Sequence, residues 1–120
     1  MKVQGEFQTA ELDDAIARAR AAPGSYAARV MQSELLSVGL YLLPPGGTDG
    51  QSPHLEDEVY FAVRGRATLR VGTEDHPVQP GTLLFVPAKA AHFFHDISEE
   101  LVLVVFWAPP ERSVAPPRPA

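Results

Sequence analysis

The side chains best suited to chemistry lie near the middle of the chain, where Glu58 follows His54. Their spacing of four is even, so in an extended strand both side chains project from the same face. Another histidine, His92, lies in the run VPAKAAHFFHD. If the two strands face each other inside a barrel, two imidazoles and one carboxylate converge, which suits a divalent transition metal with open coordination positions. A lone histidine on an apolar strand is more often a hydrogen-bonded core residue, so spacing alone leaves both interpretations open.

Two neighbours of Glu58 are candidate catalytic residues. Tyr60 continues the face of Glu58, where its hydroxyl could donate to a ligand, although a core aromatic is the simpler interpretation. Glu56 keeps the same parity and could be a fourth ligand or a base. Because bulges at barrel rims break parity, we favour an exposed or turn carboxylate for Glu56. By parity, Phe94 lines the same cavity as His92.

Composition narrows the class of protein before any fold is considered. A chain of 120 residues, 45% apolar and 21% charged, predicts one globular domain. The net charge of −5 and the lack of a Lys/Arg cluster argue against a nucleic-acid partner. Zero cysteines exclude disulfides, thiolate nucleophiles and iron–sulfur clusters. With no apolar run of about 20 residues and no secretory signal pattern, we expect a cytoplasmic protein without a membrane partner.

One helix is predicted near the N-terminus. Thr9 can cap it, acidic residues follow in the first turn, and Pro23-Gly24 ends it. Its apolar stripe is narrow and suits packing on something larger. The stripe consists of Leu12, Ile16 and Ala19.

After Gly24, short apolar or alternating runs separated by Gly and Pro clusters predict β-strands and no further helix. We expect turns at 64–66, where Gly65 would form a hairpin, and at 72–77. This pattern is typical of a β-sandwich or barrel, an all-β fold. The predicted strands are 26–32, 35–43, 58–63, 67–71, 82–86, 92–95 and 101–107. The predicted division is 1–34 for the helix and leading strand, 35–108 for the barrel, and 109–120 for a proline-rich tail.

The motifs in residues 35–109 resemble a small single-domain cupin of the RmlC-like jelly-roll superfamily. The first cupin motif is a Gly, five residues, His-x-His, three or four residues, Glu, six residues and Gly. The second is a Gly, five residues, Pro-x-Gly, two residues, His, three residues and Asn. The chain matches the intervals of both motifs in order, so the resemblance implies a cupin jelly-roll β-barrel with one N-terminal α-helix. The matching positions are Gly46, Ser52, His54, Glu58 and Gly65, then Gly81, Pro87, His92 and Asp96.

Three positions depart from these motifs. Ser52 stands where the first histidine belongs, Lys89 replaces the inner glycine of the second motif, and Asp96 replaces its asparagine. The resemblance therefore implies His54, Glu58 and His92 as metal ligands, two histidines and one carboxylate. The metal would be a divalent transition ion such as iron, manganese, zinc or nickel.

The resemblance implies either of two functions. The first is a metal-dependent enzyme of dioxygenase, isomerase or lyase type acting on a small organic molecule; the alternative is a non-catalytic module that binds one. Cupins of this kind are often homodimers. The continuous apolar run from Leu101 to Trp107 points the same way, because a strand buried on both faces needs a second cover.

Overall fold

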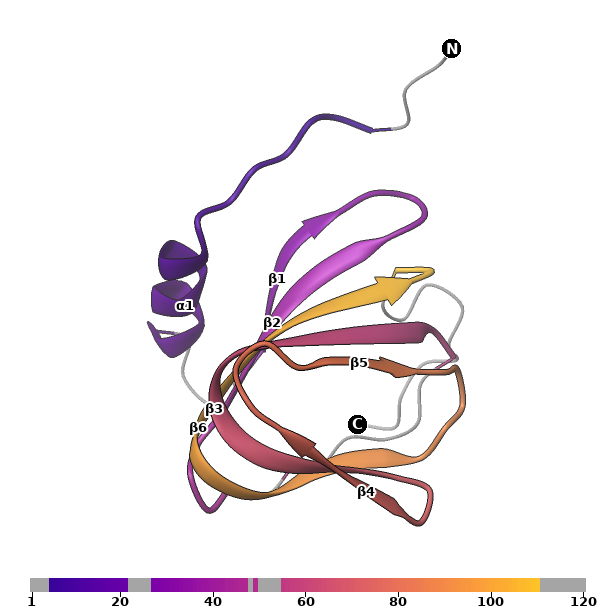
Figure 1. The fold of residues 1–120 in the computed structure, drawn as a ribbon. Helices are drawn as coiled ribbons and strands as arrows, with labels where there is room; N and C mark the ends of the chain where they lie inside the picture. The colour runs from indigo at the N-terminus through magenta and orange to yellow at the C-terminus, as the bar shows by residue number, and fades with distance from the viewer. Residues whose placement is uncertain (1–4, 22–26, 48, 50–54, 111–120) are drawn as a thin grey trace, which may run out of the picture.

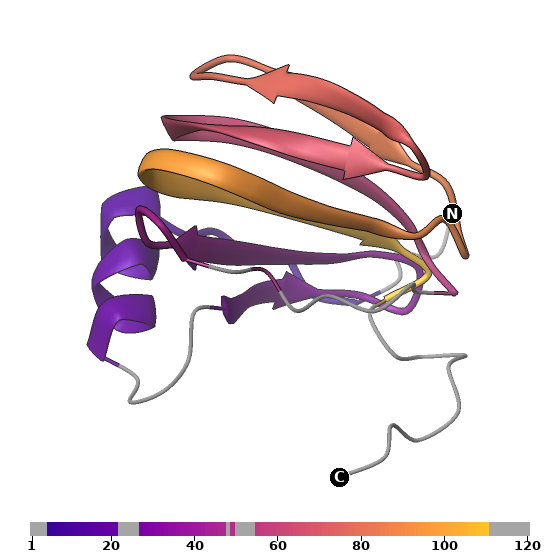
Figure 2. The same cartoon turned by 90° about the horizontal axis from the view of Figure 1, so that it is seen from below.

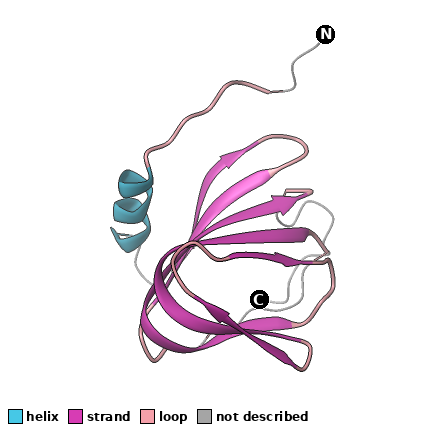
Figure 3. Cartoon of the chain, in the orientation of Figure 1, coloured by secondary structure: helices cyan, strands magenta, loops and turns pink. Residues whose placement is uncertain are grey.

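The computed structural model describes residues 5–21, 27–47, 49 and 55–110. Within them, one helix and an antiparallel sheet in the order β1-β2-β6-β3-β4, with β5 paired to β3, form a jelly-roll barrel (Figures 1 and 3). The all-β prediction with one N-terminal helix is confirmed. The elements are α1 Leu12–Ala21, β1 Ala27–Gln32, β2 Ser37–Leu43, β3 Asp57–Val71, β4 Glu74–Val78, β5 Leu83–Val86 and β6 His92–Ala108.

Strands β3 and β6 form one long antiparallel ribbon that folds back on itself (Figures 1 and 2). Glu58 pairs with Trp107 at one end of the ribbon, and Val71 pairs with His92 at the other. A straight strand from residue 58 to residue 71 would span about 43 Å. The register shifts three times between Ala62 and Thr68, and such bulges bend a ribbon. The fold-back brings the two ends together.

Gly65 lies within this bend and not in a hairpin. Its φ of +95° is left-handed, and a Cβ there would lie 2.2 Å from the carbonyl oxygen of Glu100. The prediction of a turn at 64–66 is therefore wrong: the chain continues as one strand whose bulges interrupt the alternation. The predicted strands 92–95 and 101–107 are likewise parts of β6.

The turn predicted at 72–77 is also wrong in extent. Residues from Glu74 to Val78 form β4, which pairs with the end of β3 from Ala67 to Val71. Only Gly72 and Thr73 separate the two strands, and Gly72 has a φ of +60°. The acidic and proline residues of β4 concealed a short strand at the end of the sheet order.

Helix α1 begins at Leu12, two residues later than a Thr9 cap would place it. The amide of Ala15 donates to the carbonyl oxygen of Glu11 (3.1 Å), which makes Glu11 the residue that opens the helix. The predicted apolar face is confirmed, because Ile16 and Ala19 are buried on the outer side of the sheet. Pro23-Gly24 lies outside the described residues. No helix in the described ranges is long and apolar enough to cross a membrane.

The described strands bury one main core inside the barrel and a smaller one under α1. Helix α1 covers Leu40, Leu42 and Val102 on the outer side of β2 and β6. This supplies part of the second cover that the 101–107 run requires. The main core fills the inside of the barrel, and its largest members are Tyr60, Phe94, Leu69, Leu101, Leu103 and Trp107.

Candidate metal centre

Glu58 and His92 meet inside the barrel although they lie near opposite ends of the β3–β6 ribbon. Nε2 of His92 is 3.3 Å from Oε1 of Glu58, and each side chain is 1% exposed. Both residues project from the inner side of the barrel, in keeping with the predicted parity of Glu58. The fold-back of the ribbon therefore creates this buried pair, since neither strand alone could.

Two donors fix the carboxylate of Glu58 through its second oxygen. The hydroxyl of Tyr60 donates to Oε2 (2.8 Å), and the indole N–H of Trp107 donates to the same oxygen (3.1 Å). Trp107 is the direct cross-strand partner of Glu58, so the ladder itself places the indole there. Because both donors bind Oε2, the carboxylate presents Oε1 to His92.

His92 is fixed through its other ring nitrogen. Nδ1 lies 2.8 Å from the carbonyl oxygen of Ala90, which can only accept, so Nδ1 carries the proton and Nε2 is directed to Glu58 and to the Tyr60 hydroxyl (3.1 Å). The loop before His92 is tied to the start of β3, since the amide of Ala88 donates to Oδ1 of Asp57 (2.8 Å). The ring thus has one orientation, set by the loop.

Burial and charge shift the pKa of two groups in this cluster. Burial, followed by the Glu58 carboxylate, raises the pKa of the Tyr60 hydroxyl well above 10.0, so the phenol stays a hydrogen-bond donor. Burial lowers the pKa of His92, but hydrogen bonds to Glu58 and to the Ala90 carbonyl outweigh it, and the pKa of His92 is raised. Asp49 adds negative charge nearby, and its carboxylate accepts from the amide of Phe94 (2.9 Å).

Comparison with known proteins places this fold in a family. The model of the cupin domain matches residues 39–109, more than half of the chain. The chain belongs to the cupin domain family. Each of the two cupin motifs contains one member of the buried pair: Glu58 lies in the first motif and His92 in the second.

Three similar proteins place this cupin among its relatives. An uncharacterised protein of Streptomyces coelicolor is 47% identical over 100 residues, which are 83% of this chain and 94% of that protein. The crystal structure of TT1209 from Thermus thermophilus is 34% identical with a TM-score of 0.65, over 79% of this chain and 94% of that one. A structure of DMSP lyases is 28% identical with a TM-score of 0.60, over 71% of this chain and 44% of that one.

Two of the three departures from the cupin motifs have a backbone explanation. Lys89 has a φ of +69° where the motif has glycine, and Asp96 has a φ of +50° where it has asparagine. Glycine and asparagine tolerate this left-handed conformation best. This cupin therefore keeps the backbone path of the second motif with less suitable residues. The third departure, Ser52, lies outside the described residues.

The predicted site residues have different outcomes. His54 also lies outside the described residues, so its role as a ligand stays a prediction. Tyr60 and Phe94 are buried as parity predicted, with their rings 5.1 Å apart and edge to face. Glu56 lies in the bend that precedes β3 but is only 1% exposed, so the expected exposure of its carboxylate is wrong. Burial alternates through residues 56–60, with Glu56 buried like Glu58 and Tyr60.

Sequence reasoning missed Trp107 and Asp49. Trp107 is the only tryptophan of the chain, and a buried indole usually finds an acceptor for its N–H. That signal pointed to some partner, but only the β3–β6 register identifies it as Glu58. Asp49 follows a Gly-Gly turn and gave no periodic signal at all.

The described part of this cupin offers two ligands for a divalent transition metal. An imidazole nitrogen and a carboxylate oxygen are donors that such ions accept. Each has the outer support typical of metal ligands: a carbonyl behind the imidazole and two donors behind the carboxylate. In the described ranges no group of three His, Cys, Asp or Glu side chains converges. The donor set fits the metal that the cupin motifs imply.

Proposed function

We propose that this cupin binds a divalent transition metal through Glu58 and His92, with His54 as the sequence-predicted third ligand, and acts on a small organic molecule in the barrel. One observation carries the proposal: a carboxylate oxygen and an imidazole nitrogen lie 3.3 Å apart, buried, each oriented by its own hydrogen bonds. Burying such a pair for packing alone is unfavourable, because both groups lose hydration.

In this proposal, each residue around the metal has a separate role. When bound, the metal would polarise a carbonyl or hydroxyl group, or lower the pKa of a bound water. Trp107 and Tyr60 hold Glu58 so that a single oxygen, Oε1, is available as a ligand. The Tyr60 hydroxyl also lies 3.1 Å from Nε2 of His92; because its single proton is donated to Glu58, it can only accept a hydrogen bond from the substrate. Glu56 is the candidate base.

Among the dioxygenase, isomerase and lyase classes, the lyase class has the most direct support. The solved structure of DMSP lyases is 28% identical to this chain, although the chain spans less than half of that protein. A non-catalytic module that binds a small molecule remains the competing function.

Metal content with a matched pair of histidine variants tests the proposal. The protein is purified without an affinity tag or chelator, and iron, manganese, zinc and nickel are measured by elemental analysis. Near-stoichiometric metal is expected in the wild type and in His95→Ala, and loss of metal is expected in His92→Ala. His95 is the matched control because it lies on the same strand and contacts Asp75. No metal in any sample, even after reconstitution, would leave only the binding module.

The single tryptophan gives a second readout. Since the indole N–H of Trp107 is bonded to Glu58, addition of the metal alone should change the tryptophan emission of the wild type. The same titration of His92→Ala should show no saturable change. An equal response in both proteins would contradict the assignment of His92.

A further inference from the structure

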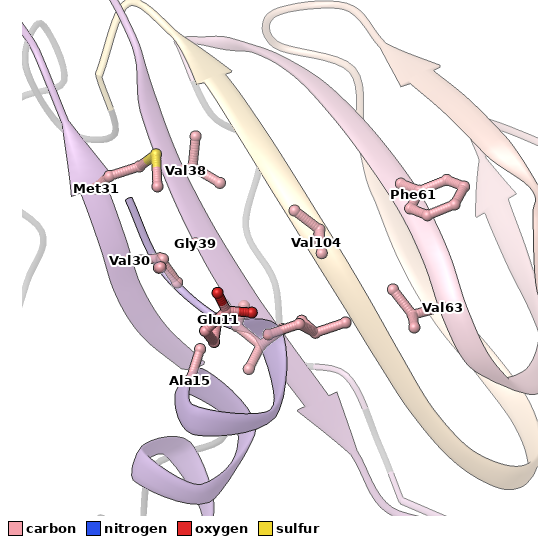
Figure 4. Close-up of a pocket in the computed structure, with 12 residues that line it drawn as sticks. Glu11, Ala15, Val30, Met31, Val38, Gly39, Phe61, Val63 and Val104 are labelled. Carbon is pink, nitrogen blue, oxygen red and sulfur yellow. The ribbon is translucent and has the colours of Figure 1, made fainter. Parts of the chain in front are cut away.

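The first turn of α1 stands over a cavity of about 270 Å³ on the outer side of the barrel (Figure 4). Further along the helix, Ile16 and Ala19 pack directly against the sheet. Strand β1 forms one wall of the cavity, and strands β2, β6 and β3 form its floor. Its lining includes Leu12 and Ala15 from α1, Val30 and Met31 from β1, and Val104 and Phe61 from the floor.

Polar contacts tie α1 and the arm before it to the sheet on both sides of this cavity. On the β1 side, the side-chain amide of Gln8 bonds to both the amide and the carbonyl oxygen of Gln32. On the β3 side, Asp13 pairs with Arg64 at 3.4 Å. Between these contacts the helix presents Ala15, whose single methyl group reaches only a short way towards the floor. The cavity therefore follows from a small side chain on a helix that is held at its edges.

The lining of the cavity is apolar except at one point. Among the described residues that line it, Glu11 is the only charged one, and Figure 4 shows its carboxylate oxygens among the apolar side chains. A carboxylate accepts hydrogen bonds and repels an anion. The lining thus favours a molecule with an apolar body, no negative charge and one hydrogen-bond donor.

The volume of the cavity limits the size of such a molecule. A dry apolar cavity of about 150 Å³ holds benzene, which has six carbons, so 270 Å³ accommodates about ten carbons in proportion. We infer that this cavity binds an uncharged aliphatic molecule of about eight to ten carbons, such as an alcohol, whose hydroxyl donates to Glu11. This site lies outside the sheet, so it is separate from Glu58 and His92 inside the barrel.

The methionine methyl groups report binding at this site. The chain has two methionines, and Met31 lines the cavity, so the signal of Met1 is the internal reference. The full chain is labelled at the methionine methyl carbons and titrated with octanol by NMR. Octanol should shift the Met31 signal in a saturable manner. Octanoate, which has the same chain length and a negative charge, should bind about tenfold more weakly because of Glu11.

Two alanines of α1 give a matched pair of variants. Ala15 is 2% exposed and faces the cavity, whereas Ala17 lies on the exposed side of the same helix. Ala15→Leu fills part of the cavity and should abolish the saturable shift of Met31. Ala17→Leu should bind octanol as the wild type does. Circular dichroism checks that both variants are folded.

A substitution at the exposed Glu11 gives an independent test if Ala15→Leu unfolds. Glu11→Gln removes the charge, so octanol and octanoate should then bind with affinities within about twofold of each other. The inference is overturned if octanol gives no saturable shift of Met31 in the wild type, or if both alanine variants respond equally. A Met31 signal that depends on protein concentration and not on octanol would also overturn it, because a second copy would then fill the cavity.

Discussion

The two faces of β3 and β6 have opposite character, although their residues alternate along the same strands. Inside the barrel, Tyr60 and Trp107 direct their polar atoms to Glu58. Outside it, their immediate neighbours Phe61 and Phe106 remain partly exposed to solvent. The inner cluster depends on residues from distant points of the chain, whereas the outward position of Phe61 and Phe106 follows from local alternation. We therefore expect the inner face to respond most to changes in backbone geometry, and the outer face to respond most to changes in side-chain chemistry.

The largest effect should come from the bend that both faces share. Gly65→Ala should lower the free energy of unfolding by about 3 kcal/mol or more, because the new Cβ would meet the Glu100 carbonyl at 2.2 Å and a left-handed φ. Gly72→Ala is the control: it has a φ of +60° and open space around it, so it should cost only about 1 kcal/mol. Urea unfolding measures both. Equal losses would mean that the close approach at Gly65 does not shape the ribbon.

An intermediate effect should separate the two faces at adjacent residues. Tyr60→Phe removes a donor from the buried Glu58 and should cost about 1–3 kcal/mol of unfolding free energy. Phe61→Tyr adds a hydroxyl at a partly exposed position and should change it by less than about 0.5 kcal/mol. If the two variants lower the free energy of unfolding equally, the hydrogen bond from Tyr60 to Glu58 contributes no more to stability than a surface position does.

The fold was largely predictable because strand alternation is a local property. Parity alone placed Tyr60 on the same face as Glu58, and the cupin motifs implied the jelly-roll barrel. The failures occurred where one local signal has two structural meanings. A glycine between arginines, as at Gly65, suits a hairpin or a bulge equally well, and only the pairing of β3 with β6 along both halves decides between them.

The candidate site was predictable only as far as individual residue types allow. Glu58 and His92 were identified from motif spacing, and the structure brings them together. The part played by Trp107 depends on register, which is a long-range property that no window of sequence contains. Glu56 was misjudged because the rule about bulges at barrel rims, although general, did not apply at this strand start.

Because the ribbon folds back at Gly65, a small change of angle at this bend moves the two ends of the ribbon by a larger distance. Each half of the ribbon extends about 20 Å from the Gly65 bend, so opening the bend by about 5° would separate Glu58 from His92 by about 2 Å. A displacement of about 1 Å can already change catalytic rates a hundredfold. Substitutions at the bend, far from any ligand, can therefore adjust the geometry of the centre while leaving its chemical composition intact.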